Sequence, residues 1–287
     1  MKNLKHYLEK AYKEGWAIGQ FNFSDFSQVK GIVKAAQSLN SPIILGTSEG
    51  ESKFVGLEEA VAVRDALIKK TGLPIFLNLD HGKSVDYLKE AILAGYDMVH
   101  FDGSKMPLDE NIEKSKEVVT FANSHDVVVE GEVGRFGTDA SRLYTGKFEI
   151  KEEDLTKTDD AEKYLSQAKV DFLAVSIGTF HGLDITGVSP NLRLERLKEI
   201  KEKTNIPMVL HGGSGTPEED IKKALKLGIS KININTETRL AFTNTLRSTL
   251  DANKDEITPY KYLQNSIDAV QKVIEGKIKL FESEDKA

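Results

Sequence analysis

The amino-acid sequence predicts an α/β protein, a single (β/α)8 TIM barrel with an extra C-terminal helix. Eight short apolar runs alternate with amphipathic stretches over most of the 287 residues. The runs are β-branched or Leu-rich without strict alternation, which is typical of parallel strands buried on both faces. Nearly every run ends in polar residues or Gly, at the edge where barrel enzymes build their sites. A doubly wound open sheet uses the same units and is the alternative.

The predicted elements follow one another without a Pro-, Ser- or Gly-rich linker, so residues 1–287 are expected to form one domain. Apolar residues three and four positions apart predict helices over Ser84–Ala94 and Pro217–Leu227. Thr216, Pro217 and the acidic residues after them are typical of a helix start. The predicted strands are Trp16–Phe23, Pro42–Ser48, Pro74–His81, Asp97–Gly103, Val127–Val133, Asp171–Gly178, Pro207–Gly212 and Ser230–Thr236.

The composition excludes several classes of protein. The 39 basic and 45 acidic side chains give a formal net charge of -6, which argues against a nucleic-acid binder. No apolar run approaches the roughly 20 residues that cross a bilayer, and the first residues lack the apolar segment of a signal peptide. We therefore expect a cytoplasmic protein with no membrane partner. Because the chain has no Cys, any metal is left to His, Asp and Glu.

Three of the six histidines directly follow predicted strands. They are His81, His181 and His211, and in a barrel the ends of their strands converge on one mouth. Three imidazoles with an open position describe a catalytic zinc site. The alternative for each is a hydrogen-bonded surface residue. His100 lies inside a strand, where packing or support of the ligands is expected.

Asp80 directly precedes His81, so strand alternation aims one of the two side chains into the barrel and the other elsewhere. A carboxylate beside a metal-bound substrate is well placed to move protons. The alternative for Asp80 is the N-cap of the helix Ser84–Ala94.

Further acidic residues are predicted at the same mouth. Asp102 ends the fourth strand, and Glu130 and Glu132 lie two apart, and hence on one face, in the fifth. Charged groups inside an apolar strand are costly unless they are paired or bind a metal. A second or alternative cation site is one interpretation, and an ion pair with Arg135 or Lys83 is the other.

Glycine-rich turns follow the seventh and eighth strands, at the usual phosphate position of such barrels. These turns are His211–Gly215 and Asn233–Thr236, and Gly182 adds another backbone amide that can approach an anion closely. The longest gap between strands begins at Gly134. It predicts a mobile active-site loop over about residues 134–160.

Several blocks in this order resemble the class II, metal-dependent fructose-bisphosphate and ketose-bisphosphate aldolases. The blocks are Gly19–Asn22, Leu79–Gly82, Phe101–Ser104, Val129–Gly134, Ile177–Gly182, His211–Ser214 and Lys231–Glu237. The resemblance implies reversible cleavage of fructose 1,6-bisphosphate to dihydroxyacetone phosphate and glyceraldehyde 3-phosphate, in glycolysis or gluconeogenesis. It also implies a catalytic Zn2+, a second divalent cation, a monovalent cation, and a homodimer or homotetramer.

By position, the resemblance assigns a role to each candidate residue. His81, His181 and His211 correspond to the zinc ligands, and Asp80 to the acid/base that exchanges a proton with the C4 hydroxyl. Asp102 and Glu132 correspond to carboxylates near a second or displaced metal. The residues that correspond to the dihydroxyacetone phosphate site are Gly182, Gly212, Gly213, Ser214, Asn233, Ile234, Asn235 and Thr236.

The sequence departs from the family pattern in two loops. The family's Gly-Gly-x-Glu-Asp loop is replaced by Gly134–Ser141, with Asp139 or Glu149 as candidates for the missing acid. Where the family often has Tyr-Lys-Gly after the second histidine, this chain has Asp184–Gly187, and the family's lysine on the phosphate side is missing. Either departure is compatible with slower turnover or with another sugar phosphate.

The polar Asn235 favours fructose 1,6-bisphosphate, because a site that binds a hydroxyl discriminates better than an apolar one. Arg239 is a candidate for binding the far phosphate. The alternatives are an aldolase for tagatose bisphosphate or another ketose phosphate, a weakly active sugar-phosphate-binding homologue, and a barrel metallohydrolase.

Overall fold

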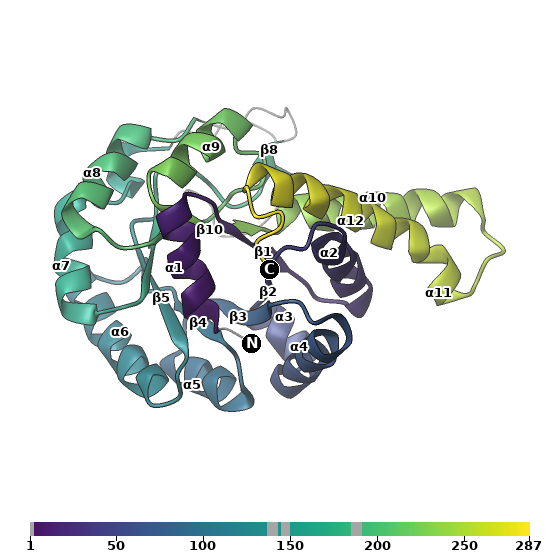
Figure 1. Cartoon of the computed structure of the whole chain (residues 1–287), viewed down its shortest axis with the longest axis horizontal. Coiled ribbons are helices and arrows are strands. Elements are labelled where there is room, and N and C mark those ends of the chain that lie inside the picture. The colour runs from purple at the N-terminus through teal and green to yellow at the C-terminus, as the bar shows by residue number, and fades with distance from the viewer. Residues whose placement is uncertain (1–2, 137–142, 145–149, 185–190) are drawn as a thin grey trace.

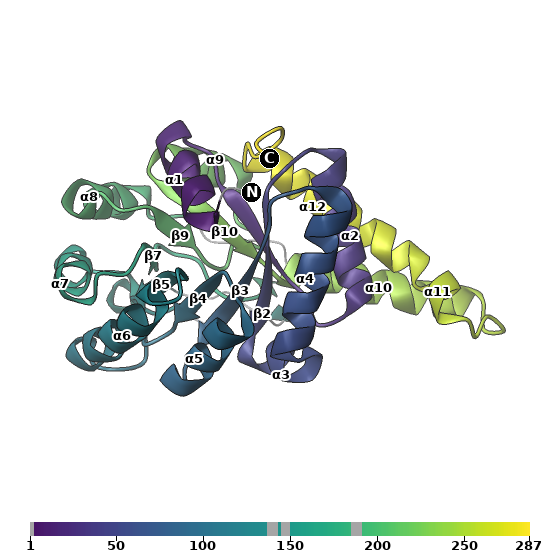
Figure 2. The same ribbon diagram turned by 60° about the horizontal axis from the view of Figure 1, so that its bottom comes forward.

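The computed structural model describes residues 3–136, 143–144, 150–184 and 191–287, and its main sheet is a closed parallel barrel (Figures 1 and 2). The order β1-β10-β9-β7-β5-β4-β3-β2 returns to β1, which pairs with β2. The predicted barrel is therefore confirmed, and the open-sheet alternative is wrong. The barrel strands are β1 (Ile18–Asn22), β2 (Ile43–Ser48), β3 (Ile75–Gly82), β4 (Met98–Phe101), β5 (Val128–Val133), β7 (Phe172–Val175), β9 (Met208–Leu210) and β10 (Ile229–Ile234).

Helices surround the barrel, and each predicted strand run overlaps one barrel strand (Figure 1). The two helices predicted from periodicity are present as α5 and α9. The helices are α1 (Leu4–Glu14), α2 (Phe26–Ser38), α3 (Glu49–Val55), α4 (Leu57–Thr71), α5 (Val85–Ala94), α6 (Leu108–Asn123), α7 (Thr158–Ala168), α8 (Leu194–Thr204), α9 (Glu218–Lys226), α10 (Thr236–Ala252), α11 (Pro259–Tyr262) and α12 (Gln264–Leu280), with a 3-10 turn at Glu152–Asp154.

The barrel interior is apolar near the amino ends of the strands. Helix α1 packs its buried face on this end and closes it. The strand residues in this apolar cluster are Ile18, Ile44, Phe76, Met98, Val128, Phe172, Ala174 and Val209.

The interior is polar toward the carboxyl ends of the same strands. Because side chains two apart point to one face, the inward series in β1 continues from Ile18 to Gln20 and Asn22. The buried polar residues of the upper interior are Gln20, Asn22, Asn78, Asp80, His100, Glu130, Glu132, His211, Lys231 and Asn233. Because these ten buried polar side chains gather at the carboxyl end of the barrel, this end is the candidate position of the functional site.

A second, two-stranded parallel sheet lies outside the barrel. It pairs β6 (Leu143–Tyr144) with β8 (Leu183–Asp184). The sequence did not predict these strands, because each is only two residues long. The pairing ties the segment after β5 to the segment that follows His181.

The C-terminal helices form an arm that projects from one side of the barrel (Figures 1 and 2). The expected C-terminal helix is present as α12, which is preceded by the short α11. Within the described residues, none of the helices is long and apolar enough to span a membrane.

Helix α12 packs closely on α2 at Gly31. A Cβ atom on Gly31 would lie 2.6 Å from the carbonyl oxygen of Ile267 and 2.9 Å from Cβ of Val270. We expect Gly31→Ala to lower the free energy of unfolding by about 1–3 kcal/mol, as overpacking does. This loss exceeds the gain of about 1 kcal/mol that Ala offers over Gly in a helix. Urea unfolding measures the difference.

Gly276 is the matched control for Gly31. It lies in α12, it is exposed, and a Cβ atom there meets nothing within 4 Å. Gly276→Ala is therefore expected to raise the free energy of unfolding by about 0.5–1 kcal/mol. Equal stabilisation by both substitutions would show that α2 and α12 separate without cost.

Candidate active site

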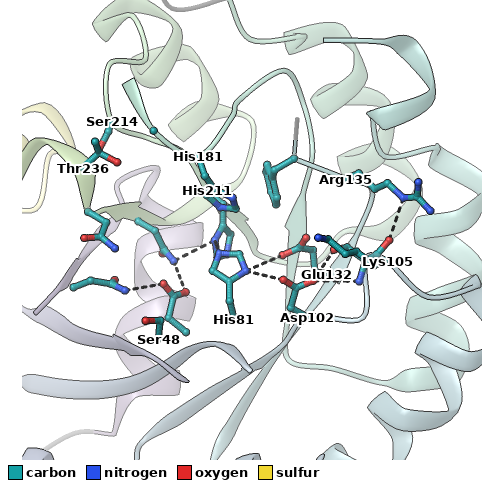
Figure 3. Close-up of a pocket in the computed structure, with 18 of the residues that line it drawn as sticks. Ser48, His81, Asp102, Lys105, Glu132, Arg135, His181, His211, Ser214 and Thr236 are labelled. Carbon is teal, nitrogen blue, oxygen red and sulfur yellow. Dashed lines mark hydrogen bonds and ion pairs between the residues drawn. The ribbon is translucent and has the colours of Figure 1, made fainter. Parts of the chain in front are cut away.

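A cavity of about 870 Å³ opens at the carboxyl end of the barrel. Figure 3 shows three histidines at its centre, with Asp102 and Glu132 on one side and Ser214 and Thr236 on the other. The predicted site residues that line this cavity are Asp80, His81, Asp102, Glu132, His181, Gly182, His211, Gly212, Ser214, Asn233, Asn235 and Thr236. The fold therefore brings together most of the residues selected from sequence.

Asp80 and His81 both reach the same site, although they are consecutive in β3. The pairing register of β3 with β4 shifts between Leu79 and Gly82, and His81 has φ of 52°. A non-glycine residue in this left-handed region is uncommon and clusters at functional sites. The expectation that alternation separates the two side chains is therefore wrong, because the irregular backbone turns both toward the mouth.

Asp80 does not cap a helix. The N-cap of α5 is Ser84, whose hydroxyl accepts a hydrogen bond from the amide of Tyr87 at 3.3 Å. The helix-cap alternative for Asp80 is thus wrong.

The carboxylate of Asp80 is buried and held by two side-chain amides. Nδ2 of Asn22 donates to Oδ2 at 2.9 Å, and Nδ2 of Asn233 donates to Oδ1 at 3.0 Å. Burial opposes ionisation, but nearby His81 and His100 outweigh it and hold the pKa of Asp80 well below its usual range. Asp80 is therefore a carboxylate that can accept a proton.

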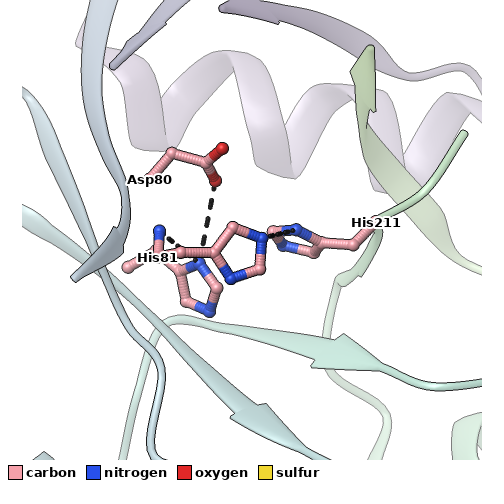
Figure 4. Close-up of side chains that lie close together, drawn as sticks. Asp80, His81 and His211 are labelled. Carbon is pink, nitrogen blue, oxygen red and sulfur yellow. Dashed lines mark hydrogen bonds and ion pairs between the residues drawn. The ribbon is translucent and has the colours of Figure 1, made fainter. Parts of the chain in front are cut away.

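His81 and His211 face one another across the mouth (Figure 4). His81 Nε2 lies 3.0 Å from His211 Nδ1, and His81 Nδ1 lies 3.0 Å from Asp102 Oδ2. Burial lowers the pKa of His211 to about 4, so its imidazole is neutral at physiological pH. A neutral imidazole is the form that binds a metal.

His100 lies closer to the cluster than the sequence indicated. It is fully buried, its Nδ1 accepts a hydrogen bond from the backbone amide of His81 at 3.1 Å, and its Nε2 lies 3.1 Å from Glu132 Oε2. His100 therefore fixes the backbone at the irregular position of β3, in line with the supporting role predicted for it.

His181 stands beside this cluster with its ring toward His81. The two ring centroids are 4.7 Å apart, and the ring of Phe136 lies 5.0 Å from that of His181. The distance from His181 to the ring of His211 is 6.1 Å. The ring of His181 therefore lies beside the other two, but its nitrogens belong to neither of the groups of mutually close ligand atoms among the described residues, so its place in a three-histidine metal site stays a prediction.

Glu130 pairs with neither Arg135 nor Lys83, so the ion-pair alternative is wrong for this residue. Its Oε1 lies 2.5 Å from His211 Nε2, and its Oε2 accepts a hydrogen bond from Lys231 Nζ at 2.8 Å. The alternative failed because Lys231, on the far side of the closed barrel, is the nearer cation.

Glu132 is contacted by histidines instead: its Oε2 lies 3.1 Å from His100 Nε2 and 3.7 Å from His81 Nδ1. Its carboxylate is buried, and neither oxygen has a hydrogen bond of good geometry within the described part of the chain. Burial and the neighbouring Asp102 raise its pKa. A buried carboxylate whose oxygens lack hydrogen bonds of good geometry is a candidate ligand for a cation.

The described side chains fit a divalent metal. Ligand atoms of two groups each lie within 4.8 Å of one another: Asp80, His81, His100 and His211, and His81, Asp102 and Glu132. Imidazole nitrogen with carboxylate oxygen is a donor set that suits zinc and related metals. His81 belongs to both groups and is the centre of the candidate metal site.

Two predicted substrate residues do not line the cavity. Ile234 is fully buried in the core, and Gly213 packs on Ile232 while its amide donates to the carbonyl of Asn233 at 3.3 Å. The predicted loop over residues 134–160 is only partly described. Its candidate acids Asp139 and Glu149 lie outside the described residues, as do residues 185–187 after Asp184.

Some cavity residues were not selected from the sequence as site residues. Ser48 ends β2 and Glu49 follows it, and Ser104 and Lys105 come after β4. Their position at or just after the end of a strand was the available signal. Arg239, the candidate for the far phosphate, lines the cavity and is bonded to the buried Glu51.

A closed parallel barrel whose titratable side chains gather at the carboxyl ends of its strands has the architecture of a barrel enzyme. Residues 2–286 match the family described as class II fructose-bisphosphate aldolase. The chain therefore belongs to the class II aldolase family, whose members are lyases and are generally metal-dependent.

Individual relatives are similar over nearly the whole chain. The 6-phospho-5-dehydro-2-deoxy-D-gluconate aldolase of Shouchella clausii (strain KSM-K16) is 39% identical over 283 residues, which cover 98% of this chain and 94% of the relative. The sulfofructosephosphate aldolase of Alkalicoccus urumqiensis is 36% identical over 283 residues, covering 99% and 97%. Among solved structures, the YdjI aldolase from Escherichia coli K12 has a TM-score of 0.83 at 28% identity, covering 100% and 99%.

Proposed function

We propose that this protein is a cytoplasmic, zinc-dependent aldolase that reversibly cleaves fructose 1,6-bisphosphate to dihydroxyacetone phosphate and glyceraldehyde 3-phosphate. The observation that carries the proposal is the position of Asp80, a buried carboxylate whose ligand oxygen lies within 4.8 Å of the ring nitrogens of His81 and His211. Aldol cleavage needs a base for the hydroxyl proton and a cation for the charge left on the ketone half. Asp80 is the proposed base, and the histidines beside it are proposed to hold the cation.

In the cleavage direction, Asp80 accepts the proton of the C4 hydroxyl while the bond between C3 and C4 breaks. Its low pKa makes the carboxylate the resting form, and the amides of Asn22 and Asn233 hold it in place. In the synthetic direction the same group returns the proton, as microscopic reversibility requires.

We assign the metal to His81, His181 and His211, with Asp102 and Glu132 as ligands of a second or displaced position. When bound, a zinc ion polarises the ketone and stabilises the negative charge that develops on its oxygen. The carboxylate of Asp102 bonds to His81 Nδ1, which leaves Nε2 of His81 for the ion. No lysine is needed to form an imine.

The proposed phosphate site lies at the start of α10. Thr236 is the first residue of this helix, and its N-cap Asn235 makes no side-chain cap bond. The amide of Glu237 donates to Ser214 Oγ at 3.4 Å, and the other first-turn amides are proposed to bind the anion. Gly212 and Gly182 adopt φ values of 64° and 119°, which bring the backbone close to the cavity. Figure 3 shows Ser214 and Thr236 together on this side.

The other end of the substrate is proposed to be anionic as well. Among the described residues, five cationic side chains line the cavity: Lys83, Lys105, Arg135, Lys151 and Arg239. The substrates named for the two relatives and for the family each carry a phosphate and a second anionic group. That second group is a carboxylate, a sulfonate or another phosphate. A site rich in cations suits each of these anions.

The second candidate is cleavage of 6-phospho-5-dehydro-2-deoxy-D-gluconate, which the relative from Shouchella clausii favours. This compound lacks a hydroxyl that fructose 1,6-bisphosphate carries. Oδ1 of Asn235 is buried and has no hydrogen-bond partner among the described residues, so it is an acceptor for a substrate hydroxyl. The missing hydroxyl belongs to the half that leaves as the aldehyde. Asn235 Oδ1 is proposed to face that half while the amides after it bind the phosphate, and this arrangement favours the fully hydroxylated sugar.

A coupled triose-phosphate assay tests the proposal. Both sugars are supplied separately to the protein, before and after chelation and after zinc is added back. Cleavage of fructose 1,6-bisphosphate that depends on zinc is the expected result. A higher kcat/KM with the deoxygluconate would establish the second candidate, and turnover unaffected by chelation would contradict the metal mechanism.

Asn235→Ala separates the two substrates. We expect kcat/KM for fructose 1,6-bisphosphate to fall about 10-fold, which is the effect of losing one hydrogen bond of roughly 1.4 kcal/mol. The deoxy compound is expected to lose much less. Asn244→Ala, an exposed position on the same helix, is the control, and an equal loss on both substrates would contradict the role of Asn235.

A further inference from the structure

Lys231 is a buried cation that the proposed reaction does not use directly. It lies in β10 with its side chain fully buried, and it is absent from the residues that line the cavity. Its Nζ donates to Glu130 Oε2 and to Asn233 Oδ1, each at 2.8 Å. Burying an ammonium group costs desolvation free energy, and even a paired buried ammonium often adds no net stability to the fold. A role for Lys231 in the site is therefore sought in its two hydrogen-bond partners, Glu130 and Asn233.

The first partner leads to the candidate metal site. Glu130 uses one oxygen for Lys231 and the other for His211 Nε2, at 2.5 Å. Because a carboxylate only accepts hydrogen bonds, Nε2 carries the ring proton. Nδ1 lies 3.4 Å from Nδ2 of Asn233, an amide nitrogen that can only donate, so Nδ1 keeps its lone pair. Nδ1 faces His81 Nε2 at 3.0 Å, so the lone pair points at the position proposed for the ion.

The second partner leads to the candidate base. Asn233 accepts a hydrogen bond from Lys231 through Oδ1, so its amide nitrogen points the other way and donates to Asp80 Oδ1 at 3.0 Å. The opposite orientation of this amide would set Nδ2 against the ammonium and Oδ1 against the carboxylate. Lys231 thus excludes it.

We propose that Lys231 is a positioning residue for both halves of the site. Through Glu130 it keeps the ring proton of His211 on Nε2, and through Asn233 it keeps an amide donor on Asp80. The inference rests on the proposed function for the roles of His211 and Asp80. Its first readouts, the ring proton and zinc binding, do not depend on which sugar is cleaved.

The ring proton of His211 is measured in the unmodified, metal-free protein. Long-range proton–nitrogen NMR spectra of 15N-histidine-labelled protein distinguish the two tautomers, and His211→Gln assigns the signals. We expect the proton on Nε2 in the wild type and a mixture of tautomers in Lys231→Met. A wild-type proton on Nδ1, or an unchanged spectrum in Lys231→Met, would overturn the proposal.

Variants then separate positioning from folding. We expect Lys231→Met to weaken zinc binding 10- to 100-fold, the range for loss of a group that supports a ligand, and to lower kcat at saturating zinc. The double variant Lys231→Met/Glu130→Gln removes both charges and is expected to recover the wild-type Tm but not kcat, since Asn233 still lacks its donor. Full recovery of kcat and zinc affinity in the double variant would reduce Lys231 to a structural ion pair.

Lys89→Met is the matched control, because Lys89 pairs with Glu117 at 2.6 Å on the outer helices. It should keep wild-type zinc affinity and kcat. If Lys231→Met does not fold, the double variant and the wild-type spectrum decide. A wild type with the expected tautomer and zinc binding but no turnover on any sugar phosphate would contradict the proposed function and leave the role of Lys231 intact.

Discussion

Asp80→Ala is expected to lower kcat for cleavage by about 10²- to 10⁴-fold, the range that general acid–base catalysis contributes, while the protein keeps its zinc. The reason is the position of Asp80 beside the candidate ligands His81 and His211, with both carboxylate oxygens held by amides. Steady-state cleavage and metal content per chain are the two measurements. Loss of zinc together with turnover would make Asp80 a ligand instead of a base.

A partial reaction sharpens this expectation. Asp80 is assigned to the hydroxyl on the aldehyde half, so proton exchange at the hydroxymethyl carbon of dihydroxyacetone phosphate should continue in Asp80→Ala. Exchange into deuterated water is followed by NMR. Asp109→Asn, which alters an exposed pair with Lys163, should leave both reactions unchanged. If cleavage persists in Asp80→Ala, the proton goes elsewhere and the assignment fails.

The sequence was informative wherever a local pattern decides the structure. Eight apolar runs separated by amphipathic stretches predicted the barrel, because only parallel strands covered on both faces bury such runs. The strand-end positions of His81 and His211 predicted the site for the same reason. Residues at the carboxyl ends of barrel strands meet whatever their distance along the chain.

The sequence was uninformative where the outcome depends on closure of the barrel. Glu130 and Lys231 are separated by 101 positions, and their strands β5 and β10 are not neighbours in the sheet, so the two side chains meet only because the sheet closes into a barrel. The joint approach of Asp80 and His81 depends on a register shift and a positive φ. Strand alternation could not predict either, because a bulge inserts a residue that the period of two does not contain.

His211→Ala is expected to weaken zinc binding by at least about 100-fold, since even the loss of a group that only supports a ligand costs 10- to 100-fold. Activity should fall with metal content. His211 is fully committed to the cluster, with Nε2 on Glu130 and Nδ1 facing His81, so its removal also leaves Glu130 without one of its two partners. Competition with a chromogenic chelator measures the affinity, and His125→Ala, at an exposed histidine, is the control.

Thermal unfolding gives a second measure of the same site. Zinc at 100 times its Kd should stabilise the wild-type fold by about 2.7 kcal/mol, because only the folded chain assembles the ligands. Zinc is expected to stabilise rather than destabilise the fold because of the buried carboxylates. Glu132 lacks a hydrogen bond of good geometry within the described residues, and a bound cation would offset its charge. At the same zinc concentration the stabilisation should fall to about 0.4 kcal/mol or less in His211→Ala and persist in His125→Ala. A wild-type Tm that does not respond to zinc would show that this cluster does not bind the metal. The positive charge that the proposed aldolase mechanism requires would then have to come from another group.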